Sequence, residues 1–162
     1  MRLWRIATET RTFVAHDLSG KGAAISPGRW NGPGQAVVYA APTVALAMLE
    51  TAAHINTLGL PLDRFLVAID LPDALWAQRQ EITLDQLPGG WSAIPAGQTS
   101  VEVGAQWLSR QSSLVLCLPS VIVPEESVAL INPAHPMASQ LTARKVRPVS
   151  YGAVFRSTLT NK

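Results

Sequence analysis

The apolar residues of this chain fall into short runs, and proline, glycine or charged residues interrupt all of them. Runs whose composition predicts strands cover residues 3–6, 37–40, 64–71, 113–118, 127–131 and 146–151. Strong helix formers follow Pro42-Thr43, over residues 44–55, and residues 99–102 have the spacing of a capping box that begins a second helix. Since strands and helices do not alternate regularly, we expect an α+β fold with short, mostly antiparallel strands rather than a doubly wound sheet.

Two connecting stretches are rich in proline and glycine. Residues 19–34 are expected to form an extended loop, and residues 72–97 to be mostly irregular with one short helical piece. No repeat, low-complexity tract or linker divides the chain. A length of 162 residues is enough to bury a core without disulfides or metals, so we expect a single domain over residues 1–162.

Composition argues against membrane and secreted proteins. No run of about 18 apolar residues is present to span a membrane, and the first residues, MRLWRIATET, are not followed by the apolar stretch of a signal peptide. The single cysteine, Cys117, cannot form an internal disulfide and is expected to be a small buried hydrophobe in a strand. These features favour a cytoplasmic protein.

The charged and metal-binding side chains indicate neither a nucleic acid site nor a metal site. The formal net charge is only +2, and the one dense basic cluster, at residues 144–147, is interpreted as a solvated surface stretch. The histidines lack the spacing of metal ligands and have no companion cysteine pair. We therefore expect no direct nucleic acid binding and no metal.

The stretch from Gly28 to Glu50 places an arginine, a tyrosine and a glutamate in three local contexts. Arg29 lies between glycines of a loop, where the backbone can approach a ligand closely and the guanidinium offers a fork to phosphate oxygens. Alternatively, Arg29 stacks on Trp30 or pairs with a carboxylate. Tyr39, at the end of a short apolar strand, can stack on a nicotinamide or adenine ring or be an ordinary core tyrosine.

Glu50 is the sharpest of these signals, because the six residues before it carry no polar side chain. A carboxylate on such a helix is partly removed from water, which is costly unless it is paired or used. It can bind ribose hydroxyls and stabilise positive charge at an anomeric carbon, or it can pair with an arginine for structure. Guanidinium, phenol and carboxylate together suit a diphosphate, an aromatic ring and a ribose, which describes NAD+.

Ser120 follows a predicted strand, in the sequence Leu118-Pro119-Ser120-Val121. A hydroxyl at the end of a strand can bind a phosphate or a ribose of a ligand. It can equally be a turn serine. The G-x-S-x-G pattern of a nucleophile elbow is absent, so we do not expect Ser120 to be a nucleophile.

Taken in order, these segments resemble the RES-domain family. The matching pieces are LWRI at 3–6, GRWN at 28–31, VVYA at 37–40, ALAMLE at 45–50, LPSVIVP at 118–124 and LINPAHP at 130–136. The resemblance covers nearly the whole chain, and GRWN followed by VVYA and a helical glutamate is its most specific part. It maps the arginine, glutamate and serine that name the family onto Arg29, Glu50 and Ser120, with Tyr39 as a further active-site residue.

The resemblance implies a fold similar to the split-sheet core of ADP-ribosyltransferases. It also implies a toxin of a bacterial toxin–antitoxin pair that is neutralised by an Xre-type helix-turn-helix antitoxin. The implied substrate is NAD+, cleaved at the nicotinamide–ribose bond by hydrolysis or phosphorolysis. The implied catalytic residues are Arg29, Tyr39 and Glu50. The implied substrate-binding residues are Arg29, Trp30, Asn31, Tyr39 and Ser120.

Two rival functions stay open at this point. A mono-ADP-ribosyltransferase toxin that modifies a metabolic enzyme would use the same residues and differ only in the acceptor. A non-catalytic nucleotide-binding module would bind NAD+ without releasing nicotinamide. The sequence does not distinguish water, phosphate and a protein side chain as acceptor, and it leaves a homo-oligomer open.

Overall fold

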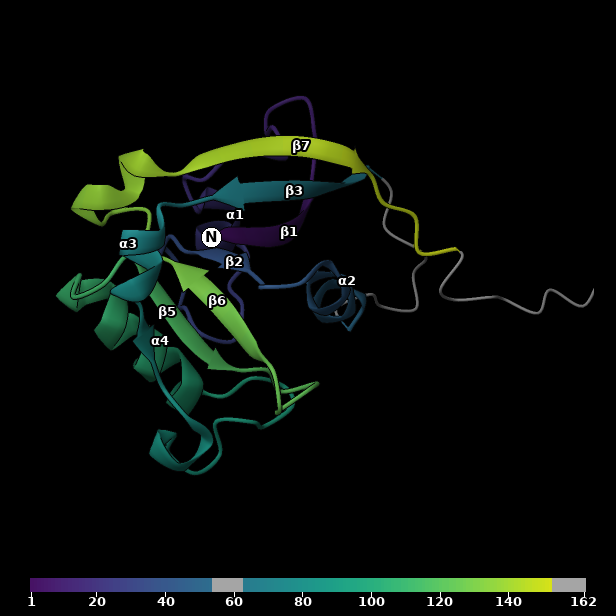
Figure 1. Cartoon of the computed structure of the whole chain (residues 1–162). Coiled ribbons are helices and arrows are strands. Elements are labelled where there is room, and N and C mark those ends of the chain that lie inside the picture. The colour runs from purple at the N-terminus through teal and green to yellow at the C-terminus, as the bar shows by residue number, and fades with distance from the viewer. Residues whose placement is uncertain (54–62, 153–162) are drawn as a thin grey trace, which may run out of the picture.

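The protein is described by a computed structural model that covers residues 1–53 and 63–152 (Figure 1). In chain order, with η for short 3-10 helices, the elements are β1 (Arg2–Thr8), α1 (Lys21–Ile25), β2 (Val38–Ala40), α2 (Val44–Ala52), β3 (Arg64–Asp70), α3 (Asp73–Ala77), β4 (Gln80–Glu81), η1 (Leu84–Gln86), α4 (Gln98–Arg110), β5 (Val115–Pro119), β6 (Ser127–Ile131), η2 (Pro136–Gln140) and β7 (Thr142–Pro148).

The strands form a three-stranded sheet of order β1-β3-β7 and a four-stranded sheet of order β2-β6-β5-β4. The pairs are antiparallel except β4 with β5. Trp4 of β1 and Ala41, just after β2, join the edges of the two sheets through two backbone hydrogen bonds of 2.8 Å. Figure 1 shows β7, β3 and β1 running across the molecule above β5 and β6. The predicted α+β fold with mostly antiparallel strands is confirmed.

Alternation along the strands divides the core between two faces of the four-stranded sheet. Every residue of β5 is buried, and successive side chains point to opposite faces. Leu116 and Leu118 pack with Trp30 and Trp107, whereas Cys117 belongs to the cluster on the other face. Burial raises the pKa of the Cys117 thiol to about 11. Cys117 is therefore the buried, protonated strand residue that the sequence predicts.

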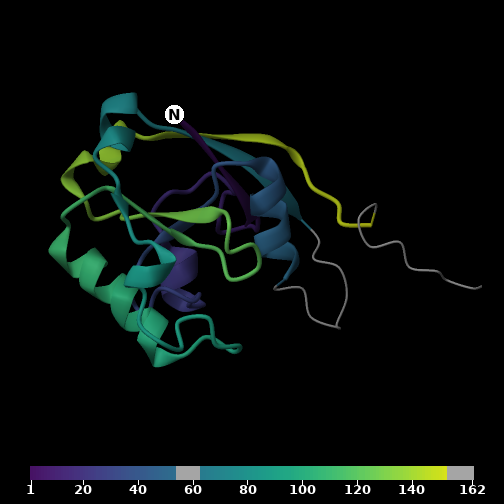
Figure 2. The same cartoon turned by 60° about the horizontal axis from the view of Figure 1, so that its bottom comes forward.

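Helix α2 begins where Pro42-Thr43 predicts, because Thr43 is its N-cap. The Thr43 hydroxyl accepts a hydrogen bond of 3.1 Å from the amide of Leu46, which satisfies one of the otherwise unpaired amides of the first turn. The predicted end of this helix, at residue 55, lies outside the described residues. Figure 2 shows α2 and α4 at separate places around the sheets.

In the described part of the chain no helix could span a membrane.

The predicted capping box at residues 99–102 is wrong, since helix α4 starts at Gln98 and has Gly97 as its N-cap. Ser100 is fully buried, and its hydroxyl donates a 3.0 Å hydrogen bond back to the carbonyl of Gly97. That hydroxyl lies inside the first turn, so it does not cap a helix that begins later.

Both proline- and glycine-rich stretches contain more regular structure than predicted. Residues 19–34 include α1, because Gly20 takes a left-handed conformation with φ +70 that turns the chain into the helix. A Cβ on Gly20 would also lie 2.6 Å from the amide nitrogen of Val37. Residues 72–97 contain two short helices, α3 and η1, and the strand β4, instead of one helical piece.

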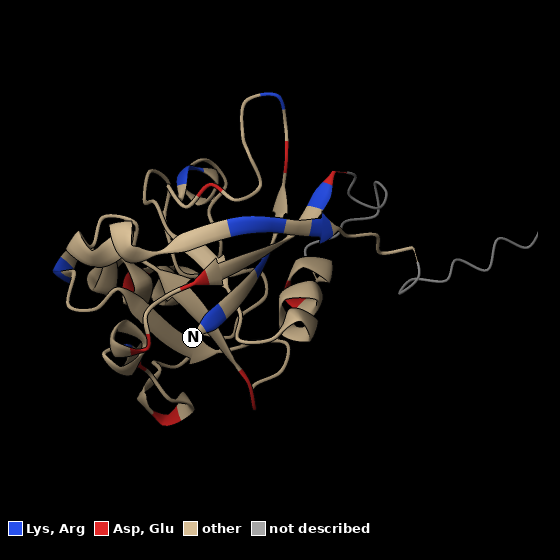
Figure 3. Cartoon of the chain, turned by 45° about the horizontal axis from the view of Figure 1, so that its top comes forward, with Lys and Arg blue, Asp and Glu red and all other residues tan. Residues whose placement is uncertain are grey.

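The last strand covers Thr142–Pro148 rather than residues 146–151. It is an edge strand whose residues are nearly all exposed, so its sequence lacks the alternation of apolar and polar residues that marks a strand. Its backbone pairing with β3, from Thr142 opposite Asp70 to Pro148 opposite Phe65, defines it instead. Figure 3 shows basic residues along this strand, as expected for the solvated basic cluster.

Candidate active site

The fold brings Glu50 and Ser120 together, although 70 positions separate them in the chain. The Ser120 hydroxyl donates a 2.5 Å hydrogen bond to Oε1 of Glu50. It accepts hydrogen bonds of 3.0 Å from the amides of Ile122 and Val123. Ser120 is only 1% exposed, and its one hydrogen and both lone pairs are used. Ser120 thus orients the carboxylate of Glu50.

Arg29 is half-buried and is held by the backbone of a distant loop. Its Nη1 donates hydrogen bonds of 2.8 Å to the carbonyls of Trp91 and of Ala93. Burial lowers the pKa of Arg29, and the nearby negative charge of Glu50 opposes that change. Glu50 therefore acts electrostatically on Arg29, and the guanidinium and the carboxylate belong to one polar cluster.

The Tyr39 hydroxyl is committed to the loop that carries Arg29. It donates a 2.7 Å hydrogen bond to Oδ1 of Asn31 and accepts one of 3.0 Å from the amide of Trp30. The ring lies against Gly28, where an added Cβ would approach its Cζ and hydroxyl oxygen to 2.7 Å. Burial raises the pKa of Tyr39 well above its usual value. Tyr39 is thus neutral, and its ring and hydroxyl support the loop that carries Arg29.

Asn31 is completely buried and is the centre of the same loop. Its Oδ1 accepts from the amide of Gly28 at 2.9 Å as well as from Tyr39. Its Nδ2 donates to the carbonyls of Ala23 and Gln35, both at 2.9 Å. These bonds satisfy the amide on both sides, so Asn31 fixes the shape of the loop. Its expected contact with a substrate stays a prediction.

Trp30 is also buried, at 2% exposed, and is fixed on two sides. Its ring stacks on the ring of Trp91, with centroids 5.9 Å apart and planes 16° from parallel. Helix α4 approaches its backbone so closely that a Cβ on Gly104 would lie 1.8 Å from the Trp30 carbonyl oxygen. The contact expected between Trp30 and a substrate is untested, and the observed contacts are internal.

Sequence reasoning missed two of these supports, Trp91 and Gly104. A glycine inside a 13-residue helix signals a close approach of another segment, because glycine is unfavourable in a helix interior. Trp91 offered no comparable signal, since nothing in its neighbourhood indicates which residue it stacks on.

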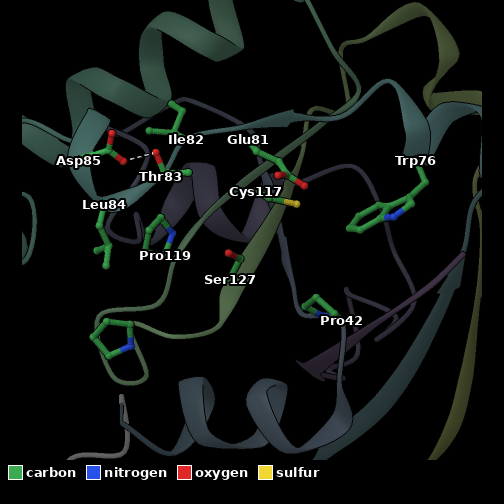
Figure 4. A pocket seen from close by; sticks show the side chains of 11 residues that line it. Pro42, Trp76, Glu81, Ile82, Thr83, Leu84, Asp85, Cys117, Pro119 and Ser127 are labelled. Carbon is green, nitrogen blue, oxygen red and sulfur yellow. Dashed lines mark hydrogen bonds between the residues drawn. The ribbon is translucent and has the colours of Figure 1, made fainter.

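A cavity of about 430 Å³ lies elsewhere in the structure (Figure 4). It is lined by Pro42, Trp76, Glu81, Ile82, Thr83, Leu84, Asp85, Cys117, Pro119, Pro124 and Ser127. None of the predicted site residues lines it. Tyr39 lies opposite Leu130 and Leu116 in the strand register, whereas Cys117 lies opposite Ala129. The cavity and Tyr39 are therefore on opposite faces of the sheet.

Within residues 1–53 and 63–152 no three histidine, cysteine, aspartate or glutamate side chains lie close enough to hold a metal ion. The expectation of a metal-free protein stays a prediction. The polar cluster of Arg29, Glu50, Ser120 and Tyr39 consists of hydrogen-bonding and charged groups, which can bind an anion and stabilise a developing cation.

The chain is similar in sequence to a known family and to curated toxins. The profile of the family described as RES domain matches residues 2–153. The Prs ADP-ribosylating toxin of Sphingobium sp. (strain YBL2) is 55% identical over 148 residues, which are 91% of this chain and 92% of that protein. Toxin Res of Yersinia enterocolitica (serotype O:8, biotype 1B) is 37% identical over 153 residues, which are 93% and 95% of the two chains.

The fold also matches a solved structure. A chain of the crystal structure of the M. tuberculosis MbcT–MbcA toxin–antitoxin complex superposes with a TM-score of 0.57 and 19% identity, over 91% of this chain and 84% of that one. At that identity the match concerns the fold alone. The family profile and the curated relatives, in contrast, both cover almost the whole chain, and they show that this protein belongs to the RES-domain family.

Proposed function

We propose that this protein is the toxin of a bacterial toxin–antitoxin pair and that it cleaves the nicotinamide–ribose bond of NAD+. The observation that carries the proposal is the half-buried carboxylate of Glu50, oriented by the hydroxyl of Ser120 and electrostatically coupled to Arg29. Such a carboxylate can stabilise positive charge on a sugar, and such a guanidinium can bind a diphosphate.

In the proposed reaction Glu50 stabilises the oxocarbenium-like transition state as nicotinamide leaves. The nicotinamide ring is a cationic pyridinium before cleavage and departs as a neutral molecule, so the step needs little acid–base catalysis. Stabilisation of the developing charge by a preorganised carboxylate is then the main contribution of the protein. The hydrogen bond from Ser120 supplies that preorganisation, because it holds Oε1 of Glu50 in place before the substrate arrives.

Arg29 binds the diphosphate or the nicotinamide ribose in this proposal, and Tyr39 packs on the nicotinamide side. The hydroxyl of Tyr39 is bonded to Asn31 and to the amide of Trp30. Its contribution is therefore the surface of its ring and the support of the Arg29 loop, not the transfer of a proton.

A second function, mono-ADP-ribosylation of a protein, is favoured by one specific observation. The relative that is 55% identical over 92% of its own length is named an ADP-ribosylating toxin. Loss of nicotinamide would follow the same course in both functions. The acceptor that attacks the ribose cation would be a side chain of a target protein instead of water or phosphate.

The proposed partner is an Xre-type antitoxin, and the proposed site of action is the cytoplasm, where NAD+ is available. Two exposed apolar side chains adjoin the candidate site: Leu49, which precedes Glu50 and is 42% exposed, and Ile122, whose amide bonds to Ser120 and which is 38% exposed. An antitoxin that covered them would exclude the substrate. A purified complex that consumed NAD+ as fast as the free chain would contradict this mode of neutralisation.

The first experiment is incubation of the purified chain, freed of any partner, with NAD+. Nicotinamide release would be followed with and without phosphate, and with and without a cell extract. Release from NAD+ alone identifies a hydrolase, and a requirement for phosphate identifies a phosphorylase. Release or label transfer that needs the extract identifies a protein ADP-ribosyltransferase. No release under any condition, with saturable binding of NAD+, would overturn the enzyme proposal in favour of a nucleotide-binding module.

A further inference from the structure

The loop from Pro88 to Gly97 has no part in the function proposed above, yet it holds the guanidinium of Arg29. The hydrogen bonds of Arg29 within the described residues run from Nη1 to the carbonyls of Trp91 and Ala93, both at 2.8 Å. Two backbone carbonyls on one nitrogen define the plane of the group more firmly than a single contact would, because each takes a different hydrogen.

The geometry of a guanidinium determines what this arrangement leaves available. The group has five N–H donors in a rigid plane, of which two are on Nη1. With both of these directed at the loop, the Nε–Nη2 edge carries the fork of parallel donors that matches a phosphate or carboxylate. The loop carbonyls thus decide which edge of Arg29 can receive an anion and in which direction that edge points.

The carbonyls are held in place by packing of the loop. Gly90 has a φ of +84, and the amide of Ala93 donates to its carbonyl at 3.1 Å, so the chain turns tightly around Trp91. The Trp91 ring stacks on Trp30, whose carbonyl is in turn in close contact with Gly104 of α4. A continuous path of contacts therefore leads from helix α4 to the guanidinium.

We propose that Trp91 is a positioning residue for the dinucleotide: through the loop carbonyls it directs the Nε–Nη2 edge of Arg29 toward the diphosphate of the substrate. This inference rests on the proposed function for the identity of the anion. The orientation of the guanidinium itself does not depend on that function.

A double-mutant cycle tests the proposal. The variants are Trp91→Ala, Trp91→Phe, Arg29→Ala and the double variant Arg29→Ala/Trp91→Ala. Ile94→Ala is the matched control, because Ile94 is in the same loop but 84% exposed. The measurements are the dissociation constant of ADP-ribose by calorimetry, and kcat and KM for nicotinamide release from NAD+.

We expect Trp91→Ala to raise the dissociation constant of ADP-ribose about tenfold. For NAD+ turnover it should raise KM more than it lowers kcat. Trp91→Phe and Ile94→Ala should stay within about threefold of wild type in each quantity. In the Arg29→Ala background the Trp91 substitution should have no further effect, because the group that it positions is gone. A similar loss in both backgrounds would show a merely structural role and would overturn the proposal. Should Trp91→Ala unfold, Trp91→Leu keeps an apolar side chain, without the planar stack, and serves in its place.

A measurement without substrate separates this inference from the proposed function. Nitrogen-15 NMR of the arginine side chains reports the rotation of each guanidinium about its Nε–Cζ bond. Slow rotation of Arg29 in the wild type that becomes fast in Trp91→Ala supports the positioning role even if ADP-ribose fails to bind, an outcome that would refute only the proposed function. Equally fast rotation in both proteins would overturn the positioning role whatever the enzyme does.

Discussion

The two faces of the four-stranded sheet differ in a way that bears on where function lies. One face carries Tyr39 and the polar cluster around Arg29 and Glu50, where side chains are hydrogen-bonded to one another and to the backbone of a distant loop. The other face opens into a cavity of about 430 Å³ near Cys117 and Ser127. The cavity and the organised charge of the cluster therefore lie on opposite faces of the sheet.

The carboxylates of the two regions show the difference clearly. Beside the cavity, Glu81 forms an ion pair with Arg79 and is 53% exposed, and Asp85 accepts a hydrogen bond of 2.5 Å from the exposed Thr83. Both are satisfied locally and face water. Glu50, by contrast, is half-buried and is oriented by a serine that is 1% exposed. Space alone therefore does not identify the site, because catalysis by charge needs groups that are fixed before the substrate binds.

The largest effect is expected from Glu50→Gln. We expect turnover of NAD+ to fall by about 100-fold or more, of the order seen when an electrostatic contact to the transition state is lost, while the fold persists. Nicotinamide release and circular dichroism would be measured together. Glu81→Gln, at the cavity, is the matched control and should keep full activity. A folded and active Glu50→Gln protein would count heavily against the assignment.

Asn31→Leu is expected to have the next largest effect. It leaves buried partners on both sides of the amide unsatisfied, including the Ala23 carbonyl and the Gly28 amide, which should cost roughly 3 kcal/mol in unfolding free energy. The melting temperature should drop by roughly 10 °C.

Asn132→Leu is the control for that substitution. Asn132 is also buried, but its amide bonds to Leu108 and Ala134, away from the Arg29 loop. Both variants should be destabilised, and only Asn31→Leu should also weaken ADP-ribose binding below its melting temperature. Equal binding by the two variants would show that the loop does not position the site.

Tyr39→Phe should have a moderate effect, because it removes the hydroxyl and keeps the ring. We expect about 2 kcal/mol lower stability, because both hydrogen bonds of the hydroxyl, to Asn31 and from the Trp30 amide, are lost. The loss of activity should be only about threefold. A loss of activity above about 100-fold would instead indicate that the hydroxyl takes part in the chemistry.

The raised pKa of Tyr39 leads to a further prediction, on how the stability of the fold depends on pH. Burial raises this pKa in the folded protein, so above pH 10, the usual value, the unfolded chain loses a proton that the folded chain retains. The stability that Tyr39 contributes is complete below about pH 10 and is lost as the pH rises further. Melting temperatures measured between about pH 8 and 11 should fall less steeply for Tyr39→Phe than for wild type, and parallel curves would contradict this.

The smallest effect is expected from Ser127→Phe, which places a ring in the cavity on the opposite face. Ser127 is exposed, so the ring has room, and nicotinamide release should stay within about twofold of wild type. Loss of ADP-ribose binding in a folded Ser127→Phe protein would place the ligand in the cavity and contradict the assignment of the site to the Tyr39 face.

Much of the fold was predictable from local sequence. Apolar runs identified β1, β2, β3, β5 and β6, and Thr43 identified the start of α2, because strand propensity and capping depend on neighbouring residues only. The two-residue strand β4 was missed, because Gln80 and Glu81 are polar and only their pairing with β5 makes them a strand. The boundaries of β7 and α4 were not predictable, since β7 is defined by pairing with β3, and α4 starts after Gly97 without a side-chain cap that the sequence could signal.

The residue types of the candidate site and, through the motifs, the family can be read from the amino-acid sequence alone. Only the tertiary structure brought Ser120 to Glu50, tied Tyr39 to Asn31, and placed the carbonyls of Trp91 and Ala93 on Arg29. The physical reason is the distance along the chain over which each kind of interaction acts. Propensities and caps act over a few residues, whereas contacts such as that between Glu50 and Ser120 exist only after helices and sheets have packed around a common core.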